Sequence, residues 1–532
     1  MDELIQALKS PPKKSNQKKR KRKQYPFLPY HPEFTPGSGK LWDIPRDWRI
    51  NLNGHPKSPD KKAAAAFTAT EETANIRHLF SRAGFGANVA EMLQYAATPI
   101  ADIVTEMLNS QLPAPPGEWI NEPFDINEYL NWTPEEQMAF LMLNYERINE
   151  MRMWWLEQMM SKATNLQEKM TLYWHGHFTT DAESAVLATF IYKQNDTLRR
   201  NALGNFRAFL KEIYKDPGML LYLDGVSNIV GAPNENFARE LLELFTMGVG
   251  NYTEDDIKEI ARALTGWEID TYNVSSFFNP NLHDYGQKTI FGQTGNFDGD
   301  DVIDIILEQE QTAIYVAGRI YEFFVSRERD EDFINELAAT FRNNDYEFKP
   351  MLEQLFNSDF FYSEDVKASL IKSPVELTVS NARLLENGSV NTFFVLAVQE
   401  LINQVLLMPP NVAGWPGQRA WINPTTYVYR NTISEIYVNE NLTRDENDNP
   451  YITFDPLAFA SSFGIETSEE LAKAMIDHLI RIPVHESTFD FLFTTLLGTA
   501  APEDWSLQYP GVEQLITDFL IQVVRLPEFH LT

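Results

Sequence analysis

The 532-residue sequence contains no cysteine, which excludes disulfide bonds, thiolate metal ligands and a cysteine nucleophile. It also lacks any uninterrupted apolar run of about 18 residues, so no transmembrane helix is expected. The most apolar stretch, residues 392–408, is broken by Gln399, Glu400, Asn403 and Gln404 and predicts a core helix. No Walker A sequence, no Gly-x-Gly-x-x-Gly opening a βαβ unit and no Gly-x-Ser-x-Gly elbow is present. Nucleotide binding and serine-hydrolase chemistry therefore have no support from the sequence.

Positive charge is scarce outside the first residues of the chain. The net charge of −30 argues against binding of nucleic acid or an anionic membrane by the body of the protein. The first 23 residues hold nine basic and two acidic side chains, a net charge of +7 that leaves −37 for the rest. Residues 1–60 are also rich in proline and predict a basic N-terminal arm, either disordered or wrapped around the body. The N-terminus has no apolar signal-peptide core, which favours a cytoplasmic location.

Helical patterns dominate residues 61–532. Segments 135–163 and 165–174 have no internal glycine or proline and are dense in Met, Leu, Glu and Lys. Residues 273–296 instead alternate aromatic and β-branched residues with Asn, Gly and His, which predicts a β-hairpin or an ordered loop. The acidic, Asn-rich residues 440–449 predict a surface loop or a subdomain boundary near 440–456. The expected fold is mainly α: a large single helical domain with one irregular or β-hairpin insertion and an extended N-terminal arm.

Residues 233–248, PNENFARELLELFTMG, predict an amphipathic helix with one strongly charged face. Glu235, Arg239, Glu240 and Glu243 fall on that face, and Glu235–Arg239 and Arg239–Glu243 are i,i+4 pairs that predict salt bridges. The next segment, NYTEDDIKEIARALTGW, begins with a capping-box pattern and carries Arg262 opposite its apolar stripe. A helical hairpin of the two segments would bring Arg262 near the glutamates.

Two short motifs use some of the nine histidines. His175 and His177 flank a glycine at the end of a predicted helix, and in an extended chain both imidazoles would reach one metal ion. Alternatively, both form hydrogen bonds within a buried aromatic cluster. His283, Asp284 and Lys288 lie in the irregular insertion and offer a metal ligand or base, its orienting carboxylate and an anion-binding cation. The alternative there is a turn stabilised by Asp284.

An aromatic segment, PPNVAGWPG at residues 409–417, is followed by Trp421. Its prolines and tryptophans indicate a stiff structure. Trp415 and Trp421 predict either the wall of a pocket for a sugar or another flat apolar ligand, or a structural lid over the core.

Several of these segments resemble the bacterial domain-of-unknown-function 1800 family. The resemblance is carried, in order along roughly residues 70–532, by RHLFSRAGFG, EKMTLYWHGHFTT, ENFARELLELFTMG, YTEDDIKEIARALTGW, HDYGQKTIFGQTGNFDGDDVIDIIL, IKSPVEL, PPNVAGWPGQRAWINP and RLPEFHL. It implies a largely helical bacterial protein and assigns no activity. Many members are encoded beside proteins of the domain-of-unknown-function 1501 family, which makes such a protein the expected partner. Many also carry export signals, in contrast to the cytoplasmic location expected from this N-terminus.

Two functional hypotheses follow. In the first, the protein is a metal-assisted hydrolase or a related enzyme on an envelope or polysaccharide-type substrate. Its catalytic residues would be His175, His177, His283, Asp284 and Lys288, with a divalent metal held by the three histidines. The glutamates of residues 233–248, Arg239, Arg262 and the two tryptophans would bind the substrate. In the second hypothesis, the protein is a non-catalytic helical scaffold that binds a partner, and the same polar residues form a buried salt-bridge network.

Overall fold

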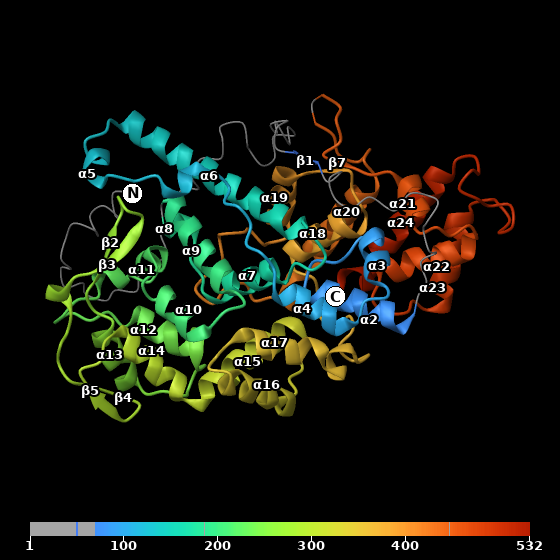
Figure 1. Cartoon of the computed structure of the whole chain (residues 1–532). Coiled ribbons are helices and arrows are strands. Elements are labelled where there is room, and N and C mark those ends of the chain that lie inside the picture. Colours follow the sequence, from blue (N-terminus) through green and yellow to red (C-terminus); the bar gives the residue numbers. More distant parts are fainter. Residues whose placement is uncertain (1–48, 52–69, 186, 446) are drawn as a thin grey trace.

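The structure, a computed structural model, describes residues 49–51, 70–185, 187–445 and 447–532, and it is mainly helical (Figure 1). The predicted fold class is therefore confirmed. Apart from residues 49–51, the predicted N-terminal arm of residues 1–60 lies outside the described residues. None of the helices in the described ranges is both long and apolar enough to cross a membrane.

The N-terminal half of the described chain is mostly helical, and its longest helix is α6 (Pro134–Met160). Its helices are α2 (Glu71–Arg82), α3 (Val89–Tyr95), α4 (Ile100–Leu108), α5 (Ile126–Tyr129), α6, α7 (Leu166–His177), α8 (Ala182–Ala185), α9 (Ala188–Asn201), α10 (Phe206–Ile213), α11 (Pro217–Tyr222), α12 (Asn236–Glu240), a π-helix (Leu241–Thr246) and α13 (Glu254–Ala263). Helices α6 and α7 coincide closely with the two helical segments, 135–163 and 165–174, that were predicted from their lack of glycine and proline.

The helices of the C-terminal half complete the fold. They are α14 (Gly299–Glu308), α15 (Glu310–Phe324), α16 (Glu331–Asn343), α17 (Phe348–Asn357), α18 (Pro374–Leu384), α19 (Thr392–Leu401), α20 (Pro424–Val438), α21 (Pro456–Ser462), α22 (Ser468–Leu479), α23 (Glu486–Leu497) and α24 (Val512–Arg525). In Figure 1, α21–α24 gather at the right-hand end, α13 lies at the left, and α7 lies between them.

The strands form three small antiparallel sheets. The insertion contains two hairpins, β2 (Trp267–Asp270) with β3 (Ser275–Phe278) and β4 (Lys288–Ile290) with β5 (Gln293–Gly295). The structure thus contains the β-hairpin predicted for residues 273–296, but there are two hairpins, and the first begins at Trp267. A third sheet, in the order β1 (Arg49–Asn51), β6 (Ser389–Asn391), β7 (Ile452–Thr453), was not predicted. The expected boundary near 440–456 therefore contains a strand that pairs with β6.

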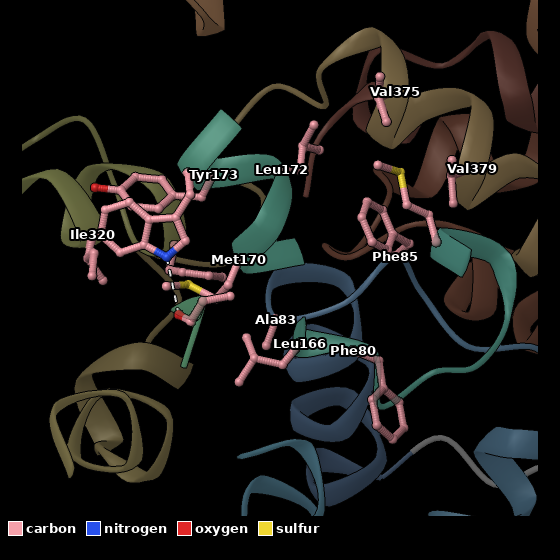
Figure 2. Close-up of a cluster of buried hydrophobic side chains, with 14 of the residues drawn as sticks. Phe80, Ala83, Phe85, Leu166, Met170, Leu172, Tyr173, Ile320, Val375 and Val379 are labelled. Atoms are coloured by element: carbon pink, nitrogen blue, oxygen red, sulfur yellow. Dashed lines mark hydrogen bonds between the residues drawn. The ribbon is translucent and has the colours of Figure 1, made fainter. Parts of the chain in front are cut away.

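Helix α7 lies in the middle of the main hydrophobic core. Figure 2 shows its side chains Leu166, Met170, Leu172 and Tyr173 among residues of α2, α15 and α18. Every residue of α7 except Gly176 is buried. A helix enclosed on all sides must also bury its polar side chains, and each of these needs a partner to offset the cost of leaving water. The buried polar residues of α7 are therefore candidates for a functional site.

Candidate functional site

A cavity of about 370 Å³ lies against one face of α7. Lys169, Leu172, Tyr173, Gly176 and His177 line it, and their spacing of three and four residues is that of one helix face. The other walls come from α2, the π-helix, α15, the start of α18 and segments 370–373 and 404–421. The volume falls within the range of about 300–1,000 Å³ that is typical of small-molecule sites.

The side chains on the cavity wall carry more positive than negative charge. The cationic ones are Arg82, Lys169, Arg319 and Arg327, and the acidic ones are Glu322 and Glu376. Burial lowers the pKa of His177 to about 3, with Arg319 acting in the same direction, so this imidazole is neutral. The protein carries a net charge of −30, yet these side chains favour an anion.

Lys169 and Glu376 form an ion pair in the cavity wall although they lie 207 residues apart in the sequence. The side chain of Lys169 is 2% exposed and that of Glu376 is 16% exposed. Glu376 also accepts the backbone N–H of Ser373 at 2.8 Å, as part of the capping box that begins α18. Burial alone would raise the pKa of Glu376, but Lys169 and Ser373 outweigh burial and lower it. The carboxylate is therefore ionised at neutral pH.

Arg82 supplies a second buried cation. Its guanidinium donates to the carbonyls of Val325 (3.1 Å) and Val366 (2.5 Å) and to Ser369 Oγ (2.8 Å), while its Nε has no partner among the described residues. Burial lowers its pKa to about 9, and Glu376 acts in the opposite direction. Arg82 therefore stays protonated at neutral pH, and backbone carbonyls rather than a carboxylate take its hydrogen bonds.

The hydroxyl of Tyr173 is buried and has no hydrogen-bond partner within the described part of the chain. Tyr173 lines the cavity beside α15, where Arg319 and Glu322 act on it electrostatically. Burial raises the pKa of Tyr173, so the hydroxyl keeps its proton and is able to donate. An unsatisfied buried hydroxyl costs about 1–3 kcal/mol, which a ligand oxygen would recover.

The two histidines of α7 form hydrogen bonds with different segments around the cavity. The metal hypothesis assumed an extended chain, but α7 continues through His177, and residues two apart on an α-helix point about 200° apart. His175 Nε2 accepts the N–H of Leu407 at 3.1 Å, and its ring packs against Trp155. His177 Nε2 donates to the carbonyl of Phe245 at 3.0 Å. His175 thus fixes the 404–421 segment, and His177 fixes the π-helix.

The π-helix is the part of residues 233–248 that reaches the cavity. Leu244 lines the wall, and its carbonyl accepts the hydroxyl of Tyr315 at 2.9 Å. Thr246 Oγ1 donates to the carbonyl of Leu241 at 2.5 Å within the same turn. π-Helical turns are rare and occur often at functional sites, and the sequence prediction of a regular α-helix did not include one.

The charged face of residues 233–248 lies at the surface instead. Arg239 reaches Glu235 and Glu243 at 3.4 Å each, as the i,i+4 spacing predicts, and Glu254 at 2.8 Å. The expectation that Arg262 lies beside these glutamates is wrong. Glu254, the first residue of α13, takes that place, whereas Arg262 lies eight residues, about 12 Å, further along the helix. The predicted binding residues Glu235, Arg239, Glu240, Glu243 and Arg262 do not line the cavity.

The motif of the insertion forms a tightly bonded turn. His283 Nδ1 donates to the carbonyl of Thr265 at 2.9 Å. Asp284 accepts Arg262 Nε at 2.8 Å, and this ion pair lowers the pKa of Asp284 despite partial burial. Lys288 is buried and donates to the carbonyls of Asp284 (2.5 Å) and Gly286 (3.1 Å). His283, Asp284 and Lys288 are thus engaged within the insertion and with residues at the end of α13, and the cavity lies elsewhere.

The tryptophan segment meets α7 at a pair of glycines. Gly414 has φ +74°, and a Cβ at this position would overlap the carbonyl oxygen of Gly176. This close approach places Trp415 on the cavity wall, with its ring centroid 5.4 Å from that of His175. Trp421, which is 5% exposed, lines the same cavity. Both predicted binding tryptophans therefore lie at the site.

The predicted metal centre is not assembled in the described residues. No three His, Asp or Glu side chains there form a group able to hold a metal ion. His175 and His177 point to different walls, and His283 packs against Phe278 and Tyr285 in the insertion. The residues present do not fit a divalent metal at the proposed histidine set.

The model of the family described as "Protein of unknown function (DUF1800)" matches residues 78–531, so the chain belongs to this family. No curated protein matches the chain, and no solved structure does.

Sequence reasoning missed most of the charged groups of the cavity. Arg82, Lys169 and Glu376 each lie in a segment that carries the family resemblance: RHLFSRAGFG, EKMTLYWHGHFTT and IKSPVEL. The available signal was that the neighbours of Lys169 at helical spacing, Leu166, Leu172 and Tyr173, are apolar. A lysine on a buried helix face needs a partner, because lysine is almost never fully buried unless it is paired.

Proposed function

We propose that this protein binds a small organic anion with an apolar portion in the cavity against α7. The observation that carries the proposal is the excess of cationic over acidic side chains on the cavity wall. Two of these cations, Arg82 and Lys169, are almost completely buried. Buried cations without enough counter-charge are costly, and a bound anion would supply that charge. Trp415, Trp421 and Phe323 provide apolar surface for the rest of the ligand.

Calorimetric titration and thermal unfolding with a matched pair of probes test this proposal. Benzoate and benzyl alcohol have a similar size and differ in charge. Benzoate is expected to bind and to raise the Tm, whereas benzyl alcohol is expected to do neither, because only the carboxylate meets the cations. Equal effects of the two probes, or none, would contradict the proposal.

A matched pair of variants tests whether benzoate binds in the cavity against α7. Arg319→Gln removes a cation from the cavity wall whose side chain is 38% exposed, so the fold is expected to survive. Arg207→Gln is the control, because Arg207 is 34% exposed and pairs with Asp304 and Asp345 outside the cavity lining. Benzoate affinity is expected to fall about tenfold in Arg319→Gln, which corresponds to the loss of one charged contact. In Arg207→Gln the affinity is expected to stay unchanged.

Hydrolysis of the bound anion is the second candidate function. The observation that favours it is Glu376, an ionised carboxylate on the cavity wall beside Lys169, since such a pair is able to accept and return a proton. Release of 4-nitrophenol from 4-nitrophenyl hydrogen succinate by the purified protein tests this function. Glu376→Asp, which keeps the charge but shortens the side chain, is expected to lower kcat with little change in binding. Unchanged kcat would argue against a role for Glu376.

One structural observation supports the scaffold hypothesis. Buried ion pairs away from the cavity, such as Arg199–Glu168 and Arg383–Glu91, resemble the network that this hypothesis expected, although with other residues. A partner of the domain-of-unknown-function 1501 family remains a prediction from the family resemblance. Copurification of the two proteins tests it. Nucleic acid is not expected as a partner of the acidic body.

A further inference from the structure

We infer that the group recognised in the cavity is a dianion, such as a phosphate monoester or a dicarboxylate. This inference rests on the proposed function and specifies the ligand. Its basis is the number of cations that share the carboxylate of Glu376.

The cavity wall alone holds four cationic and two acidic side chains. One of the acids, Glu322, is already engaged by Arg319 (3.0 Å), Arg327 (3.3 Å) and Arg329 (2.9 Å). The α15 side of the cavity therefore has more guanidinium groups than carboxylates. Planar guanidinium groups suit anions with several oxygens, since they donate two parallel hydrogen bonds.

The other acid, Glu376, serves four buried basic side chains. Lys169 contacts it directly, and Arg82, Lys372 and Arg430 lie within its electrostatic range. Arg430 is fully buried, and its Nε and one of its terminal nitrogens have no partner among the described residues. Its remaining nitrogen donates to the carbonyl of Lys372 at 2.8 Å. A single carboxylate, 16% exposed, thus faces four basic side chains that are almost completely buried.

The two sides of the cavity together leave an excess of at least two positive charges without a side-chain counterpart. A monoanion would offset half of this excess, and a dianion would offset all of it. The hydroxyl of Tyr173, which has no partner in the described part of the chain, adds a neutral donor for a further ligand oxygen. This combination matches a group with two charges and three or more oxygens.

Phenyl phosphate and phenyl sulfate form the decisive pair of probes for the full chain. They have nearly the same shape, but at pH 7.5 the phosphate ester is a dianion and the sulfate ester a monoanion, because the second pKa of a phosphate ester is about 6. Calorimetry at pH 7.5 is expected to show at least tenfold tighter binding of phenyl phosphate. At pH 5.0, where phenyl phosphate is a monoanion, the difference is expected to disappear. Phthalate, a planar dicarboxylate, distinguishes a preference for charge alone from one for a tetrahedral phosphate.

The outcomes separate this inference from the proposed function. Equal affinity for phenyl phosphate and phenyl sulfate at pH 7.5 would overturn the dianion inference and leave the binding of organic anions intact. Binding of neither probe, together with no binding of benzoate, would overturn both. In Arg319→Gln the preference for phenyl phosphate is expected to shrink, whereas Arg207→Gln is expected to retain it. An unchanged preference in Arg319→Gln would place the dianion site outside this cavity.

Discussion

Replacing Glu376 with glutamine leaves Lys169 buried without its counter-charge. Lys169 is 2% exposed, so water cannot solvate the ammonium group in the folded protein. Breaking a buried pair in this way typically costs about 3–5 kcal/mol. An upper bound comes from deprotonation of Lys169. From the ordinary lysine pKa of about 10.4, losing the proton at pH 7 costs about 4.6 kcal/mol at about 1.36 kcal/mol per pH unit. The unfolding free energy is therefore expected to fall by about 3–4.6 kcal/mol at pH 7.

The pH dependence distinguishes this cause from simple loss of packing. Burial already lowers the pKa of Lys169 in the wild type, although Glu376 acts in the opposite direction. In Glu376→Gln this opposing effect is lost and the folded-state pKa falls further below its unfolded value, so the stability of the variant rises more steeply with pH. At pH 9 deprotonation costs only about 1.9 kcal/mol, and the variant is expected to recover up to about 2.7 kcal/mol relative to the wild type at the same pH.

Urea unfolding at pH 7 and pH 9 measures both effects. The double variant Lys169→Met/Glu376→Gln is expected to recover most of the loss, because an apolar replacement of a buried pair is often neutral. Glu469→Gln is the control, since Glu469 pairs with Lys473 on the surface, and it is expected to cost about 0.3–0.5 kcal/mol. A loss below about 1 kcal/mol for Glu376→Gln, or the same loss at both pH values, would refute the reasoning.

Three further outcomes are expected from urea unfolding. Gly414→Ala should cost more than about 2 kcal/mol because its Cβ meets backbone, whereas Gly417→Ala, at φ +71° with no atom within 4 Å, should cost about 1 kcal/mol; equal losses would contradict the close contact. Because burial lowers the pKa of His177 to about 3, this residue should make stability fall as the pH drops below about 6.5, and His177→Gln should reduce the wild-type slope by up to about 1.36 kcal/mol per pH unit; an unchanged slope would argue against a neutral buried imidazole. Arg239→Ala should cost less than about 1 kcal/mol, but Arg383→Ala, which breaks a buried pair, more than about 3 kcal/mol, and the reverse order would contradict the assigned burial.

Local patterns predicted the helices well and the cavity poorly. Helices α6 and α7, the capping box of α13 and the pairs of Arg239 depend on residues a few positions apart, which the sequence displays directly. The π-helix was missed because a helical wheel assumes 100° per residue, and one wider turn shifts every later side chain. The metal hypothesis failed for a different reason: it assumed an extended chain at His175 and His177, where α7 continues as a helix.

The cavity depends on contacts that no local pattern contains. Lys169 and Glu376 read as ordinary helical charges until the fold brings together segments 207 residues apart. Trp415 and Trp421 were predicted as a pocket wall or a lid because the prolines and tryptophans of this segment indicate a stiff structure. The acidic residues near 233–248 attracted attention by their density, yet dense charge is typical of a solvated face.

The separation of Lys169 from Glu376 also has a consequence for synthesis of the protein. At about 5–20 residues per second, roughly 10–40 s pass between translation of one partner and translation of the other. Until then α7 has no carboxylate for Lys169 and no 404–421 segment to receive His175. The middle of the core is thus completed by a late part of the chain, and the apolar surface of α7 is prone to aggregation until that part is synthesised.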